Sequence, residues 1–127
     1  MRKFDDINRL TGEVIGAAIE VHKELGPGLL ESIYEECLCI ELKNRDIFYE
    51  RQKDLPIKYK GVQIDKELRM DLFVSRNLIA EVKACEKIIP IHEAQLITYL
   101  KLAEIKIGLL INFNVPVLKD GIKRLAV

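Results

Sequence analysis

An uninterrupted apolar run near the carboxyl end restricts the fold of this chain more than any other feature. The run, KIGLLINF at residues 106–113, shows no alternation between apolar and polar side chains. This pattern is typical of a buried strand, because a strand with one face in water alternates instead. The run therefore predicts a sheet that is covered by helices.

Two helical segments precede the predicted strands. In residues 5–25, apolar side chains recur every three or four positions, as on one face of a helix. Gly26 and Pro27 end this helix, because Gly26 suits a left-handed cap and Pro27 cannot continue the hydrogen-bond ladder. The spacing predicts a second helix from about Leu29 to Lys43, with Gly28 as its N-cap. Its apolar side is expected to consist of Leu30, Ile33, Cys37 and Ile40.

From residue 47 the period changes to that of strands. Short stretches rich in β-branched and aromatic residues are interrupted by Pro56 and by a Lys-Gly pair. We expect an antiparallel meander there, a third helix that begins at Pro90, and an edge strand over residues 121–127. Helices that cover a mixed sheet of this kind give an α/β or α+β fold. The length fits a single domain, residues 1–127.

Composition excludes several classes of protein. Apolar residues make up 49% of the chain and charged residues 31%, which favours a folded protein over a disordered one. No apolar run approaches the roughly 18 residues of a membrane span. The opening residues also lack the apolar stretch of a signal peptide, so we expect a cytoplasmic protein with no membrane partner. The formal net charge is zero, so the broad basic signature of many nucleic-acid binders is missing.

A ribbon at residues 69–84, RMDLFVSRNLIAEVKA, combines an apolar set of positions with a polar one. Apart from Arg76 in the expected turn, alternate positions from Met70 to Ala84 are apolar, as on a face packed against a core. The ribbon alone leaves open whether the opposite set is a solvated sheet face or a functional patch. That set consists of Asp71, Phe73, Ser75, Ile79, Glu81, Lys83 and Cys85.

The turn inside the ribbon decides which polar side chains face each other. A turn centred on Arg76 would place Asp71 opposite Glu81, and one centred on Asn77 would place Asp71 opposite Lys83. Either register gathers the two acids and the lysine on one patch. Two nearby carboxylates repel each other, and Mg²⁺ relieves this repulsion by taking oxygen ligands and water. A lysine beside such a cation can neutralise charge that develops on a phosphate, as phosphodiester hydrolysis requires.

Asp71, followed on the adjoining strand by Glu81, Val82 and Lys83, resembles the motif of the PD-(D/E)XK nuclease superfamily, with Met70 in place of the proline. The order of predicted elements is similar to that of this superfamily as well. The resemblance implies a restriction-endonuclease-like core that carries the site on two neighbouring strands.

Two further motifs sharpen the resemblance. GLLESIY, which contains Gly28, Glu31 and Tyr34, matches the Gly-x-x-Glu-x-x-Tyr signature of the GxxExxY family, described as a nuclease branch of the superfamily. QLITY, with Gln95 and Tyr99, resembles the Gln-x-x-x-Tyr motif of RecB-like nucleases. Together with the wording around these motifs, the resemblance covers nearly the whole chain.

The resemblance implies roles for the matching acids and for the lysine. Asp71 and Glu81 would hold Mg²⁺ or Mn²⁺. The carbonyl group of Val82, between Glu81 and Lys83 in the sequence, is a candidate for a further oxygen ligand. Glu31 would be a further acidic ligand or would orient water on the metal. Lys83 would help to activate that water or would stabilise the transition state.

Three other side chains are candidates for substrate contact. Gln95 and Tyr99 would contact the nucleic-acid backbone or position Lys83, as the RecB-like motif implies. His92 follows the proline that opens the third helix, where its ring either approaches the patch or lies on the surface. Tyr34 is expected to serve packing rather than chemistry.

The expected function is a metal-dependent nuclease that hydrolyses phosphodiester bonds of DNA by a metal-activated water. One alternative is a catalytically inactive binding or adaptor protein that keeps the nuclease fold. Another is a structural protein in which the patch forms salt bridges. A domain of this size with one site could cut both strands of a duplex only by forming a homodimer or by rebinding.

Overall fold

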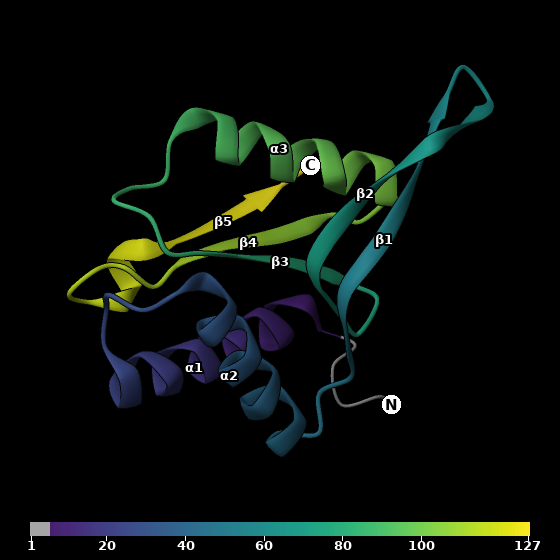
Figure 1. Cartoon of the computed structure of the whole chain (residues 1–127). Coiled ribbons are helices and arrows are strands. Elements are labelled where there is room, and N and C mark those ends of the chain that lie inside the picture. Colours follow the sequence, from purple (N-terminus) through teal and green to yellow (C-terminus); the bar gives the residue numbers. More distant parts are fainter. Residues whose placement is uncertain (1–5) are drawn as a thin grey trace.

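A computed structural model describes residues 6–127, which form three α-helices, a five-stranded sheet and a short 3₁₀ helix (Figure 1). The helices are α1 (Ile7–Leu25), α2 (Glu31–Asn44), α3 (Pro90–Ala103) and the 3₁₀ helix η1 (Leu118–Gly121). The strands are β1 (Tyr49–Tyr59), β2 (Val62–Val74), β3 (Leu78–Lys83), β4 (Ile107–Asn112) and β5 (Ile122–Ala126). Residues 1–5 lie outside the described residues. They include Asp5, where the first helix was predicted to begin, and part of the stretch that was searched for a signal peptide.

The strands lie in the order β1-β2-β3-β4-β5, and every neighbouring pair is antiparallel except β3 and β4, which are parallel. Helix α3 connects the parallel pair and lies on one face of the sheet, whereas α1 and α2 cover the other face (Figure 1). One buried apolar cluster lies between the sheet and helices α1 and α2, and a second lies between the sheet and helix α3. The mixed sheet flanked by helices confirms the predicted fold class, and β4, buried at every position, confirms the prediction for residues 106–113. None of the described helices is long and apolar enough to cross a membrane.

The predicted orientation of α2 is wrong. Most of the expected apolar side is exposed: Leu30 is 70% exposed and Ile40 53% exposed, whereas Cys37 is partly buried against the core cluster. The helix buries Tyr34 and Leu38 instead. Its sequence carries apolar residues on two sides, so helical periodicity alone could not decide which side meets the sheet. The predicted N-cap is wrong as well, because the helix begins after Leu30 rather than after Gly28.

The short strand segments expected between residue 47 and the third helix form two long strands, β1 and β2, and one short strand, β3. Pro56 does not interrupt β1, because β1 is an edge strand and the pairing register shifts between Pro56 and Lys58. The turn between β1 and β2 uses Lys60 and Gly61, both with positive φ. The outer part of this hairpin, the β1–β2 arm, projects beyond the helices (Figure 1).

The ribbon's alternate positions do not all face one core. Leu72 packs under α1 and α2, whereas Met70 belongs to the cluster under α3. The change of side occurs where Gln52, in β1, adopts a positive φ of 52°. On the other set of positions, Ile79 is fully buried in the α3 cluster. The solvated-face interpretation is therefore wrong, because α3 covers this side of the sheet.

Gly121 provides a test of how tightly the sheet end near β4 is packed. A methyl group at this position would meet the backbone carbonyl oxygen of Asn112 and would lie 3.0 Å from a side-chain carbon of Val115. We expect Gly121→Ala to destabilise the protein by about 1–3 kcal/mol in urea unfolding, because backbone atoms cannot move aside cheaply. Gly12→Ala is the matched control. Its methyl group would meet nothing within 4 Å in helix α1, so it should stabilise by about 0.5–1 kcal/mol. Equal stability of the two variants would contradict this packing.

Candidate active site

The site forms where β2 and β3 separate. Their ladder extends from the Val74–Leu78 pair to the Leu72–Ala80 pair, a register centred on Arg76, and this confirms the first of the two predicted registers. Just beyond the ladder, Asp71 and Glu81 face each other across the opening gap.

Each of the two acids caps the backbone of the opposite strand. Glu81 Oε2 accepts a hydrogen bond from the Asp71 N–H at 2.7 Å. Asp71 Oδ2 accepts one from the Val82 N–H at 2.8 Å. The side chains thus satisfy N–H groups at the point where the strand ladder ends, as buried backbone groups require. The same exchange brings two carboxylates to one place.

Burial and neighbouring negative charges raise the pKa values of both carboxyl groups. Burial, and then the charge of Asp71, raises the pKa of Glu81 to about 8. Burial also raises the pKa of Asp71, and the charges of Glu35 and Glu31 raise it further. Lys83 acts in the opposite direction on both pKa values but does not reverse either shift. A cation at this point would favour the ionised forms of both acids.

The donor atoms of the pair suit a hard divalent cation. Mg²⁺ and similar ions take oxygen ligands, need only one or two carboxylates and keep several waters. Within residues 6–127, no three His, Cys, Asp or Glu side chains are arranged as a metal-binding group. The carboxylate oxygens of Asp71 and Glu81 would be enough protein ligands for a hard divalent cation that keeps several waters. The predicted third ligand, the Val82 carbonyl, stays a prediction.

Helix α2 brings two more acids to the same side of the molecule. A pocket of about 360 Å³ is lined by Leu30, Glu31, Ser32, Glu35, Gln52 and Asp71. Glu31 and Asp71 therefore line the same pocket. The role of Glu31 as a metal ligand stays a prediction. Helix α2 begins at Glu31, so the side chains that it contributes to the pocket come from its first turns.

Three polar residues that were not predicted from the sequence, Glu35, Arg51 and Gln52, form a hydrogen-bonded network that reaches Asp71. Glu35 is only 5% exposed. Its two oxygens accept hydrogen bonds from Arg51 Nε at 2.7 Å and from Gln52 Nε2 at 2.8 Å. Gln52 Nε2 also lies 3.4 Å from Asp71 Oδ1. The available signal was the spacing of four between Glu31 and Glu35, which places both on one side of a helix.

Helix α3 contributes the predicted Gln95 and Tyr99. Gln95 Nε2 donates to the Tyr99 hydroxyl at 3.1 Å. Burial, and then the charge of Glu81, raises the pKa of Tyr99, so the phenol lies within electrostatic reach of the acid pair. The structure therefore brings this pair of residues to the border of the site. Their contact with substrate stays a prediction.

Two other candidates have clear structural partners. His92 Nδ1 accepts a hydrogen bond from the Ile89 N–H at 3.1 Å and so caps the start of α3. The Tyr34 hydroxyl donates to the Gly26 carbonyl at 2.6 Å, and its ring stacks on Phe113 with centroids 4.6 Å apart. Tyr34 therefore serves packing, as predicted. Substrate contact by His92 stays a prediction.

The end of β4 fixes the backbone that carries Lys83. The Phe113 N–H donates to the Lys83 carbonyl at 2.9 Å. The Asn112 side chain, 1% exposed, accepts from the Cys85 N–H at 3.1 Å and donates to the Cys85 carbonyl at 2.9 Å. These bonds hold the chain on both sides of Ala84. The backbone from Lys83 to Cys85 is therefore held by polar contacts to the end of β4.

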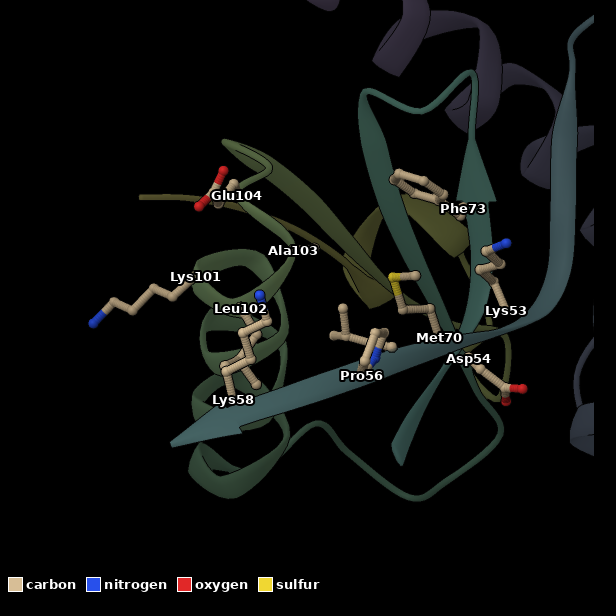
Figure 2. A pocket seen from close by; sticks show the side chains of 11 residues that line it. Lys53, Asp54, Pro56, Lys58, Met70, Phe73, Lys101, Leu102, Ala103 and Glu104 are labelled. Carbon is tan, nitrogen blue, oxygen red and sulfur yellow. The ribbon is translucent and has the colours of Figure 1, made fainter. Parts of the chain in front are cut away.

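A larger pocket lies elsewhere, between the β1–β2 arm and the carboxyl end of α3 (Figure 2). Its volume is about 510 Å³, and its apolar floor includes Pro56, Met70, Phe73 and Leu102. Its lining does not include Asp71, Glu81 or Lys83. Pocket size therefore does not identify the site in this protein, and the arrangement of titratable groups does.

The raised pKa of Glu81 predicts how the stability of the metal-free protein depends on pH. The ordinary pKa is 4.5 and the folded-state value is about 8, so between these values the folded state holds a proton that the unfolded state has lost. Stability should therefore fall as pH rises from 5 to 8, with a limiting slope of about 1.4 kcal/mol per pH unit for one group. Urea unfolding in EDTA should show this fall, and Glu81→Gln should reduce its slope. Stability that rises over this range in the wild type would contradict the assignment.

Comparison with known proteins agrees with this geometry. A family model described as the PD-(D/E)XK nuclease superfamily matches residues 8–125, which include every element from α1 to β5 except the terminal residue at either end. Searches of curated proteins and of solved structures gave no significant match. The match extends over far more than half of the chain and includes both strands of the acid pair. The chain therefore belongs to the PD-(D/E)XK nuclease superfamily.

Proposed function

We propose that this protein is a nuclease of the GxxExxY branch that hydrolyses phosphodiester bonds of DNA with Mg²⁺ or Mn²⁺. Membership of the superfamily implies a nucleic-acid substrate, and nucleases of this superfamily generally use divalent metals. The observation that carries the proposal is the pairing of buried Glu81 with half-buried Asp71 beside Lys83, with both acid pKa values raised. The choice of DNA is supported by the resemblance of Gln95 and Tyr99 to the RecB-like motif.

A divalent cation, when bound, would polarise the phosphate and increase the acidity of water. In this chain, carboxylate oxygens of Asp71 and Glu81 would hold it, and the Val82 carbonyl and Glu31 are further candidates. The Lys83 ammonium group would stabilise negative charge that develops on the phosphate and would orient the attacking water. Gln95 and its hydrogen-bonded partner on α3 would restrict the position of the DNA backbone.

The adaptor alternative explains less of the structure. The raised pKa values of Asp71 and Glu81 mean that ionising both acids costs free energy of folding, and a cation bound between them would relieve this cost. Capping the two backbone N–H groups does not require acids, because neutral Asn and Gln oxygens accept the same hydrogen bonds. The proposed homodimer, which would let one small domain cut both strands, and the cytoplasmic location stay predictions.

Cleavage of labelled DNA tests the proposal. With Mg²⁺ or Mn²⁺ the wild type should cut at least one of single-stranded, double-stranded or branched DNA, and EDTA should abolish the reaction. We expect Lys83→Ala and Asp71→Ala each to reduce kcat by about a hundredfold or more, because each removes charge needed in the transition state. An RNA of the same sequence, assayed in parallel, tests the choice of DNA.

Lys87→Ala is the matched control, since Lys87 is an exposed lysine in the loop after β3 and contacts none of the acids of the site. It should cleave like the wild type. Thermal unfolding of every variant separates loss of chemistry from loss of fold. If Lys83→Ala cleaved as fast as the wild type, the role given to this lysine would be wrong.

A further inference from the structure

Gln52 has an unusual backbone conformation for its place in the fold. Its φ of 52° lies in the left-handed region, although it sits inside strand β1. In residues 6–127, the other non-glycine residues with positive φ lie in loops, turns or a helix cap: Asp46, Lys60, Ser75, Arg76 and Glu104. An L-residue in this region costs free energy, and glutamine has no special tolerance for it. Such strain persists where surrounding contacts hold it, often at functional sites.

The strained residue lies directly across from the acid pair. Arg51 pairs with Leu72 and Lys53 pairs with Met70, so Gln52 stands opposite Asp71 without any slip of the register. This is also where β2 leaves β3 and where the ribbon changes the core that it faces. The kink in β1 and the opening of the site are therefore parts of one local distortion.

The side chain of Gln52 joins two acids from different elements. Its Nε2 donates to Glu35 Oε1 of helix α2 at 2.8 Å, and the same nitrogen lies 3.4 Å from Asp71 Oδ1 of β2. The amide nitrogen has two hydrogens, so it can serve both carboxylates at once. It is also neutral, so it separates two negative groups without adding charge. Arg51 holds the other oxygen of Glu35 at 2.7 Å and so fixes the anchor on which Gln52 depends.

We propose that Gln52 is a positioning residue of the active site, whose amide holds the Asp71 carboxylate against the fixed carboxylate of Glu35. The inference rests on the proposed function and deepens it. The left-handed backbone conformation of Gln52 directs its amide toward Asp71. The contacts of the amide with Glu35 and Asp71 offset the backbone strain. Gln52 does not touch the reacting atoms and acts through the orientation of Asp71, as residues behind metal ligands do.

The test compares Gln52→Ala with Gln52→Gly. Both variants lose the amide, so kcat for DNA cleavage should fall about 10–100-fold in each, while KM for DNA stays unchanged. Their stabilities should differ, because glycine adopts positive φ without strain and alanine does not. We therefore expect Gln52→Gly to melt at a higher temperature than Gln52→Ala while being equally slow. A purely structural role would instead make activity follow stability, with the glycine variant the faster of the two.

Gln52→Glu tests the need for a donor. It keeps the shape of glutamine but replaces the amide by a carboxylate, which would repel the carboxylates of Glu35 and Asp71. Gln52→Glu should therefore be at least as slow as the alanine variant. Gln63→Ala is the matched control, because Gln63 lies on the projecting β1–β2 arm and pairs with Lys58. It should behave like the wild type in every assay. Full activity of Gln52→Glu would overturn the inference.

Calorimetric titration with Mn²⁺ supplies a readout that does not depend on turnover. Gln52→Ala and Gln52→Gly should both bind Mn²⁺ about tenfold more weakly than the wild type. If the wild type cleaves and binds Mn²⁺ and both variants match it, the inference is wrong and the proposed function stands. If the wild type neither cleaves nor binds Mn²⁺, the proposed function is wrong and the inference is overturned with it.

Discussion

The structure of the site depends on the exchange of hydrogen bonds between Asp71 and Glu81 where β2 leaves β3. In an unbroken antiparallel ladder, backbone groups would pair across the strands and the side chains would only face each other. Here the strands separate, and each carboxylate accepts from a backbone N–H of the opposite strand. This exchange closes the end of the ladder and brings buried Glu81 and half-buried Asp71 together. The resulting shortage of positive charge is what a divalent cation would relieve.

The surrounding elements support this arrangement. Helix α3 brings Tyr99 within electrostatic reach of Glu81, and α2 brings Glu31 and Glu35 to the pocket that Asp71 lines. The carboxyl end of β4 holds the backbone after β3 through Asn112. Precise placement of charged groups on regular elements, with polar support behind them, is what a preorganised catalytic site requires. The fold thus supplies the positions, and a small number of polar contacts supply the orientation.

Sequence patterns predicted the parts of the site that depend on local rules. The period-two ribbon placed Asp71 opposite Glu81 once the turn was centred on Arg76, and the register confirms this. The face of α2 could not be predicted, because two apolar stripes compete and only packing against the sheet decides between them. Glu35 and Gln52 were missed for a related reason. Their contact joins residues 17 positions apart and requires a backbone kink that no local motif announces.

Titration of the Glu81 carboxyl carbon by NMR, in EDTA and then in Mg²⁺, tests most directly whether the acid pair is a cation-binding catalytic site. We expect a pKa of about 8 for Glu81 without metal. The pKa should fall by more than about one pH unit when Mg²⁺ is added, because the cation favours the ionised form. An ordinary glutamate titration near pH 4–5 without metal, or a raised pKa that does not respond to Mg²⁺, would show that the acid pair is not a cation-binding catalytic site.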